Sequence, residues 1–275
     1  MNPHALPNTS PLALVRSCWK HRQLLYQLVV RDVAQRYRGS MLGLLWSLFQ
    51  PLLMLLIYTF VFSTVMKVRW TAGSDSKTEF AFLLFAGLCM FGLFADIVNR
   101  APRLVLEHAS YVKRVVFPLE ILVLMVAGSA LFNFVVQVAA LLAVQLLVDG
   151  RLPWTVVLLP LVVLPLLLFS IGVGWFLASI SVYLRDVAPL VALVTTALMF
   201  LSPVFYSAES VPEPARHLLA LNPLTVPIKQ ARDVLIWGHG VDAGPLLLGV
   251  AVLAAVAWAG YWWFQRTRRG FADVL

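Results

Sequence analysis

Six long apolar runs divide this chain into candidate membrane-spanning segments. Each run carries few or no charged residues and is long enough to cross a bilayer core as an α-helix, which takes roughly 17 to 25 residues. The pattern predicts an all-α polytopic membrane protein that forms one transmembrane domain over residues 1–275. The six predicted transmembrane helices are residues 41–66, 80–98, 119–148, 154–182, 188–206 and 243–264.

The basic residues indicate which side of the membrane each connecting segment occupies. Six crossings place both termini on one side, and the segments on that side hold fourteen of the 21 Lys and Arg residues, against seven on the other side. Because basic loops are retained in the cytosol, this asymmetry predicts cytosolic N- and C-termini. An aromatic belt from Trp258 to Phe264, followed by three arginines, supports the same orientation for the last span.

Residues 11–38 show a different pattern, because their apolar residues recur at steps of three, four and seven. Such spacing places one apolar stripe along a helix, opposite a basic and polar face. It predicts an amphipathic helix in the inner membrane interface, and an ordinary soluble helix packed on a partner is the alternative. The stripe consists of Leu12, Val15, Trp19, Tyr26, Val30, Val33 and Tyr37.

Two connecting segments carry predicted structure of their own. Segment 100–118 has a proline near each end, which predicts a short, charged cytosolic helix between the second and third spans. Segment 207–242 is too apolar for a free outer loop and is punctuated by prolines. Its stretches 213–221 and 226–237 are each too short to cross a bilayer, so we expect two re-entrant helices that are buried against protein.

The composition agrees with a chain dissolved in lipid. Hydrophobic residues make up 61% of the sequence and charged residues 12%, with a mean hydropathy of +0.86, whereas a soluble domain carries about 25% charged residues. The net charge of +8 comes from Lys and Arg that flank the apolar runs rather than forming one basic face. This placement favours an anionic membrane surface as partner and argues against nucleic acid.

Several kinds of chemistry are missing from the sequence. No Lys follows a Gly, so the chain has no phosphate-binding loop of the Walker A type, and any ATP must be hydrolysed by another subunit. The five histidines are scattered and neither HExxH nor CxxC occurs, which makes a metal site improbable. We therefore expect a transport subunit that is not itself an enzyme and holds no cofactor, with ATP and Mg²⁺ on the partner.

Polar residues within the spans are few. Asp96 and Glu120 fall near the predicted cytosolic helix ends, and the absence of charges deeper in the spans argues against an ion-coupled carrier. Asn133 and Gln137 lie four residues apart on one face, where hydrogen bonds between helices are a better interpretation than a substrate site. Aromatic residues within the spans are packing residues or apolar platforms on which sugar rings slide: Tyr58, Phe62, Trp175, Phe200, Phe205 and Tyr206.

Three stretches resemble the membrane (permease) subunit of type-2 ABC exporters of polysaccharide, the Wzm/TagG-like family that handles O-antigen, capsule and teichoic acid. Residues 31–53 show its basic-aromatic segment followed by Ser, Leu-Gly, Trp and Pro. Residues 112–122, VKRVVFPLEIL, are similar to the end of its coupling helix. The third stretch contains YLRDV at 183–187, FLSPVFYSAESVP at 200–212 and LNPLT at 221–225.

The resemblance implies a homodimer in a bacterial inner membrane, clamped by two ABC ATPase subunits. The cargo would be a polyprenyl-diphosphate-linked polysaccharide, with O-antigen preferred. Segment 100–118 would be the coupling helix, which docks on the ATPase. The residues that it implies for this contact are Arg103, Glu107, His108, Tyr111, Lys113 and Arg114.

The role of four residues near the inner interface stays open from the sequence. They either attract the lipid diphosphate or simply orient and anchor the chain: Arg31, Arg36, Tyr37 and Arg38.

The function of the whole chain also has alternatives. The same architecture also suits export of a drug or a simple lipid. A membrane-embedded glycan-modifying enzyme is a third possibility, but the acidic residues of the outer segments are spread over three separate loops and do not form a catalytic cluster.

Overall fold

The computed structural model describes residues 9–38, 43–58, 60–61, 77–112 and 117–275. Every regular element among these residues is a helix. Besides the helices introduced below, short 3-10 turns and one short helix connect or extend the longer elements. These are η1 (Gly43–Leu45), η3 (Trp154–Leu158), η4 (Ala208–Ser210), η6 (Arg268–Gly270) and α12 (Phe271–Val274).

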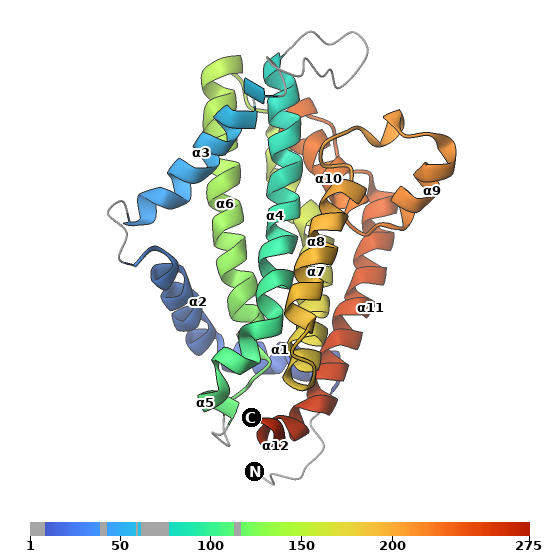
Figure 1. Ribbon diagram of the computed structural model, residues 1–275. Helices are drawn as coiled ribbons and strands as arrows, with labels where there is room; N and C mark the ends of the chain where they lie inside the picture. Colours follow the sequence, from blue (N-terminus) through green and yellow to red (C-terminus); the bar gives the residue numbers. More distant parts are fainter. Residues whose placement is uncertain (1–8, 39–42, 59, 62–76, 113–116) are drawn as a thin grey trace.

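Four long apolar helices form the body of the molecule (Figure 1). They are α4 (Lys77–Glu107), α6 (Ile121–Asp149), α7 (Leu159–Tyr183) and α11 (Ala243–Thr267). At 1.5 Å per residue they are roughly 38 to 46 Å long, so each can cross a hydrocarbon core of about 30 Å. Their length and hydropathy confirm four of the predicted spans.

The two other predicted spans contain shorter helices. Helix α3 (Trp46–Tyr58) has 13 residues and α8 (Val187–Leu201) has 15, which correspond to roughly 20 and 23 Å. Residues 62–66 of the first predicted span lie outside the described residues. The count of six crossings therefore stays a prediction, whereas the four long helices are each long and apolar enough to cross a membrane.

The prediction of one helix over residues 11–38 is wrong, because the structure divides it into α1 (Pro11–Lys20) and α2 (Arg22–Tyr37). His21 leaves the helical conformation and caps α1 through its backbone N–H. In Figure 1, α1 crosses the base of the bundle and α2 rises obliquely beside α6. Most of the predicted stripe faces outward, since Leu12 and Trp19 are 80% and 72% exposed, whereas Val33 and Tyr37 at its end are partly buried.

The prediction of a separate helix over residues 100–118 is also wrong. Helix α4 continues through Pro102 to Glu107, and α5 (Ala109–Val112) follows it, whereas residues 113–116 of the predicted helix lie outside the described residues. Pro102 removes one backbone hydrogen bond, but it is buried where α4 packs between α6 and α7. Packing of this kind outweighs the loss of a single backbone bond in a membrane helix.

Segment 207–242 folds close to the predicted boundaries. Helix α9 (Glu213–Leu221) coincides with the first predicted helix, and α10 (Thr225–Arg232) continues into the π-helical turn η5 (Asp233–Trp237) to form the second. Helix α10 packs against α4 and α7, and its residue Ile228 is fully buried. Helix α9 instead exposes Leu218 and Leu221 and buries only Leu219 among its leucines. Insertion of the two helices into the outer leaflet remains a prediction.

The closest helix crossing joins α7 to α11. Gly172 and Gly260 meet backbone to backbone, so that a Cβ atom on Gly260 would overlap the Gly172 carbonyl oxygen, and one on Gly172 would lie 2.6 Å from Cα of Ala257. Small residues permit such an approach, which replaces lipid contacts by helix-to-helix packing. The crossing fixes the C-terminal helix against the centre of the bundle.

We expect Gly260→Ala to destabilise the protein by about 1–3 kcal/mol, because the added methyl group meets rigid backbone. Gly249→Ala in the same helix is the matched control, since its Cβ atom would make ordinary contact with Pro165 at 3.9 Å. The apparent melting temperature of the detergent-purified protein measures both effects. Equal melting temperatures for the two variants would show that the crossing is looser than described.

Candidate functional site

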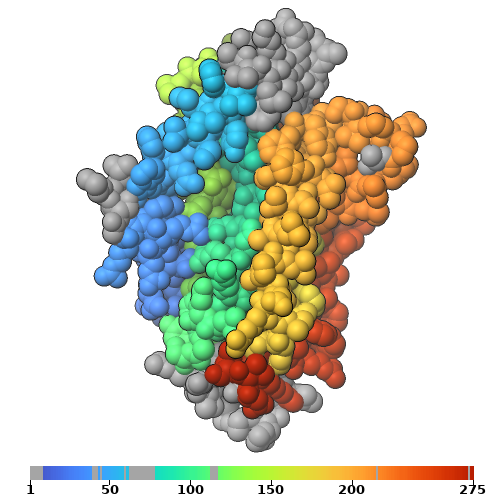
Figure 2. All heavy atoms as spheres, in the orientation of Figure 1, coloured from blue at the N-terminus to red at the C-terminus, as the bar shows by residue number. Residues whose placement is uncertain are grey.

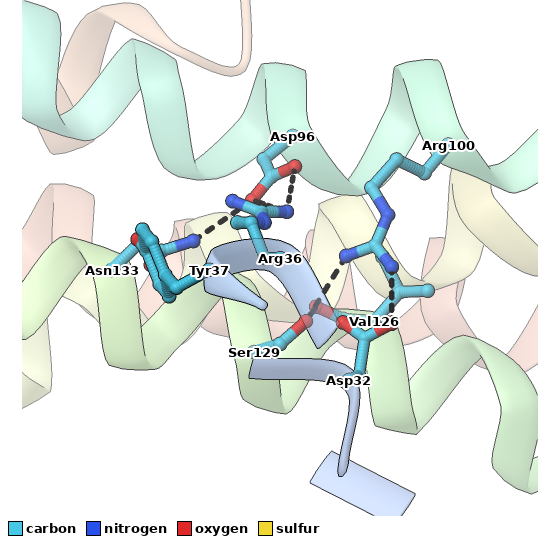
Figure 3. A network of polar contacts seen from close by, with 8 residues as sticks. All are labelled: Asp32, Arg36, Tyr37, Asp96, Arg100, Val126, Ser129 and Asn133. Carbon is cyan, nitrogen blue, oxygen red and sulfur yellow. Dashed lines mark hydrogen bonds and ion pairs between the residues drawn. The ribbon is translucent and has the colours of Figure 1, made fainter. Parts of the chain in front are cut away.

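Two ion pairs hold α2 against α4 (Figure 3). Arg36 of α2 donates to both carboxylate oxygens of Asp96 of α4 at 2.9 and 3.0 Å. Arg100 of α4 donates to Asp32 of α2 at 2.6 Å. Each of these two helices carries an Asp residue that is followed four positions later by an Arg residue. The antiparallel alignment of the two helices pairs each Asp with the opposite Arg, whereas a parallel alignment would place like charges together.

Neutral side chains of α6 complete this polar network. The Tyr37 hydroxyl donates to the side-chain oxygen of Asn133 at 3.0 Å, and Arg100 donates to the Ser129 hydroxyl at 3.1 Å. Asn133 therefore joins helices by hydrogen bonds, as the sequence predicts. Because α2 is linked in this way to both α4 and α6, the position of its C-terminal half is fixed.

Asp32 is the most buried member of the two ion pairs, with a side chain that is 14% exposed. Burial alone would raise the pKa of this carboxyl group, but the hydrogen bond from Arg100, the neighbouring Ser129 hydroxyl and the positive charges of Arg100 and Arg36 hold the pKa below its usual value. Asp32 is therefore ionised at neutral pH. Its Oδ1 atom accepts from Arg100, while Oδ2 is buried without a hydrogen-bond partner among the described residues.

A cavity of about 570 Å³ opens above the network, between the end of α2 and helices α3, α4 and α6. We call it the upper cavity. One part of its wall is polar and another part is aromatic, the combination that suits a ligand with both hydroxyl groups and apolar faces. Its polar residues include Arg36, Asp96, Asn133, Gln50 and Gln137, and its aromatic residues are Tyr37, Trp46, Tyr58, Phe85 and Phe134.

A second cavity, of about 450 Å³, lies below the network and is called the lower cavity here. Helix α4 forms its floor, between α2 and the start of α8 (Figure 2). Its wall holds five charged residues and one histidine: Arg31, Asp32, Arg100, Arg103, Glu107 and His108. Arginine side chains in a partly enclosed site favour an anionic group as ligand.

The residues that the resemblance implies for ATPase contact lie at the lower end of α4 and in α5. Arg103 and Glu107 are exposed, and the His108 ring stacks on Tyr111, which stacks on Phe117. The stack joins α5 to the base of the bundle. Lys113 and Arg114 lie outside the described residues.

The four residues proposed for the lipid diphosphate occupy different surroundings. Arg31 borders the lower cavity, whereas Arg36 and Tyr37 belong to the network and border the upper cavity. Arg38 is exposed at the end of α2. Because Asp96 already balances the charge of Arg36, Arg31 is the arginine of this set that borders a cavity and whose charge is still available to an anion.

The aromatic residues that were predicted to line a channel also lie in different surroundings. Trp175 is 1% exposed, and its indole nitrogen donates to the Glu120 carbonyl at 3.1 Å, so it is a packing residue and offers no face to a sugar. Tyr58 borders the upper cavity. Phe200 stacks on Phe205 at the end of α8, and the Tyr206 hydroxyl donates to the Phe200 carbonyl. Phe62 lies outside the described residues.

The sequence analysis missed a buried arginine at the opposite end of the molecule. Arg232 of α10 is 3% exposed and donates to the backbone carbonyls of Leu83, Pro203 and Val204 at 2.7 to 2.8 Å. It thereby ties the turn after α8 to α4. Gly87 leaves room for the guanidinium group, since a Cβ atom there would lie 2.6 Å from it. No feature of the sequence around Arg232 distinguishes it from an exposed loop arginine.

Glu120 is a second residue whose role became visible only in the structure. It accepts hydrogen bonds from Ser17 of α1 at 3.0 Å and from Arg268 after α11 at 3.1 Å. Both termini are therefore fastened to the residue that precedes α6. Among the described residues, no group of three or more His, Cys, Asp or Glu side chains is placed to hold a metal ion.

Comparison with known proteins gives a consistent result. The sequence model of the ABC-2 type transporter family matches residues 23–236. The chain is 33% identical to the O-antigen export system permease protein RfbA of Myxococcus xanthus, over 96% of this chain and 100% of that protein. It is 28% identical to a protein of the same name from Klebsiella pneumoniae, over 92% and 95% of the two chains. The polysialic acid transport protein KpsM of Escherichia coli is 23% identical, over 85% and 90%.

We expect that exchanging the charges of α2 alone, by Asp32→Arg with Arg36→Asp, places like charges together and lowers the apparent melting temperature by roughly 5–10 °C. Adding Asp96→Arg with Arg100→Asp restores opposite pairs and should recover most of this loss. The matched control is the exposed Lys229–Glu209 pair, whose exchange should change little. Failure of the fourfold variant to recover would contradict the antiparallel pairing as the source of stability.

Proposed function

The chain belongs to the ABC-2 type transporter family, and we propose that it is the transmembrane subunit of an ATP-driven exporter of polyprenyl-diphosphate-linked polysaccharide, with O-antigen as its cargo. The observation that carries this proposal is the similarity along nearly the whole chain to proteins named as O-antigen export permeases. An exporter of a drug or a simple lipid receives no such support, because these relatives are named for polysaccharide.

The two cavities suit such a cargo. The upper cavity combines aromatic faces with amide and carboxylate groups, which matches sugar rings and their hydroxyl groups. The lower cavity supplies positive charge nearer the end of the molecule that carries both termini. A lipid-linked glycan presents both kinds of chemistry. We propose Tyr58 at the upper cavity and the Phe200, Phe205 and Tyr206 cluster as contacts along the glycan path.

ATP hydrolysis in this proposal belongs to a separate ABC ATPase subunit, which binds ATP and Mg²⁺. The segment from Arg103 through α5 to Arg114 is the proposed contact with that subunit. The stacking of Tyr111 on Phe117 and the hydrogen bonds of Glu120 support this assignment. These contacts link α5 to α1, to the start of α6 and to the C-terminal segment, so a displacement of α5 would be transmitted to them.

A second copy of the chain is the proposed partner within the membrane. Helices α3 and α8 both expose large apolar side chains, among them Phe49, Leu56, Leu193 and Phe200. These two helices lie on either side of α4 (Figure 2). Pairing of two copies through these surfaces would enclose the face on which the lower cavity opens. The proposed location is the bacterial inner membrane, with both termini in the cytosol.

Deletion of the gene from a bacterium that displays O-antigen tests the function. We expect the surface polysaccharide to disappear, and the unaltered gene to restore it when supplied from a plasmid. Intact surface polysaccharide after deletion would contradict the proposed cargo.

The coupling segment can be tested separately in the purified complex with the ATPase. We expect replacement of Glu107 or Tyr111 by Ala to lower the ATP hydrolysis rate of the complex at least threefold or to weaken its assembly. Glu213→Ala, an exposed acidic position in α9 at the other end of the molecule, is the matched control. Assembly and hydrolysis equal to those of the control would exclude this segment as the contact.

A further inference from the structure

The lower cavity contains positive charge that the protein itself does not neutralise. Arg100 is engaged by Asp32 and Ser129. Arg31 and Arg103 also border the cavity, but neither makes an ion pair or a side-chain hydrogen bond with any described residue. Two guanidinium groups from two different helices, α2 and α4, are therefore available to one ligand. Phosphate oxygens are the acceptors that match guanidinium groups best.

Asp32 in the wall of the same cavity does not pair with these two arginines. Its Oδ1 atom accepts from Arg100, and its Oδ2 atom is buried within the protein, out of reach of a ligand in the cavity. The cavity therefore calls for an anion.

The rest of the cavity wall is apolar, and the volume of the cavity suits a small-molecule ligand. Leu28, Leu104, Met125, Ala188 and Ala192 line the cavity beside the charged residues. A volume of about 450 Å³ lies within the range of roughly 300 to 1,000 Å³ that is typical of small-molecule sites. A diphosphate attached to a lipid combines the anion with an apolar tail.

We propose that the lower cavity binds the diphosphate of the lipid-linked cargo, with Arg31 and Arg103 on phosphate oxygens. This inference rests on the proposed export function. Glu107 and His108 border the same cavity and lead directly into α5. Occupancy of the cavity therefore changes the surroundings of the segment proposed to contact the ATPase, and the headgroup stimulates ATP hydrolysis.

Binding of farnesyl diphosphate tests the anion part of the site. The complex with the ATPase is placed in phosphatidylcholine nanodiscs, and the dissociation constant is compared for the unaltered chain and for Arg31→Gln with Arg103→Gln. We expect binding at least tenfold weaker in the double variant. Arg151→Gln is the matched control, because it removes an exposed positive charge far from the cavity and should bind as the unaltered chain does. Arg103→Lys keeps the charge and should retain most of the affinity.

Three further binding measurements identify which part of the ligand the cavity recognises. Farnesol lacks the diphosphate and inorganic diphosphate lacks the lipid, so each should bind at least tenfold more weakly than farnesyl diphosphate. In nanodiscs of phosphatidylglycerol, the phospholipid headgroup should compete only slightly with farnesyl diphosphate for the cavity. Equal competition by phosphatidylglycerol would overturn the assignment in favour of an ordinary phospholipid headgroup. Equal binding of farnesol would overturn the role of the arginines.

The folded state of the double variant is checked by its melting temperature, which should match that of the unaltered chain because neither arginine is paired with a described residue. Unchanged binding by this folded variant would overturn the inference. If gene deletion still abolishes surface polysaccharide in that case, the export function stands and only the cavity assignment fails. The proposed stimulation fails if farnesyl diphosphate does not raise ATP hydrolysis at least twofold, or raises it equally in the double variant.

Discussion

The reciprocal ion pairs between α2 and α4 fix the geometry on which both cavities depend. Asp32 and Arg36 on one helix meet Arg100 and Asp96 on the other, and in surroundings of low polarity a charge that loses its partner is costly. The alignment of α2 is therefore restricted to one register and one direction. The upper cavity lies above these pairs and the lower cavity below them, with α2 contributing to the wall of each.

The base of the molecule extends this constraint to the termini. Glu120 holds α1 through Ser17 and the C-terminal segment through Arg268, and the buried rings of Trp175, Tyr261 and Phe271 pack around the same region. Helix α5 is attached to this base by stacked aromatic rings. Helix α5, α1 and the C-terminal segment are thus joined to one another through the base of the molecule.

The sequence predicted the long apolar helices and the bounds of α9 well, because run length and proline spacing act locally. It did not predict the break at His21 or the continuation of α4 through Pro102, since both depend on how the helices pack. The repeated Asp-x-x-x-Arg spacing of α2 and α4 was visible in the sequence, but only the three-dimensional alignment shows that the two pairs are reciprocal. Arg232 could not be identified, because its acceptors are backbone carbonyls of residues 28 to 149 positions away.

Transport itself is the central claim, and it can be measured with only two proteins. Proteoliposomes would contain this chain, its ABC ATPase and a lipid-linked O-antigen, with the ATPase facing outward and a glycosidase added outside. We predict that ATP increases the fraction of glycan protected from the glycosidase, and that this increase is lost with an ATPase that cannot hydrolyse ATP. A protected fraction that is the same with and without ATP would contradict the account.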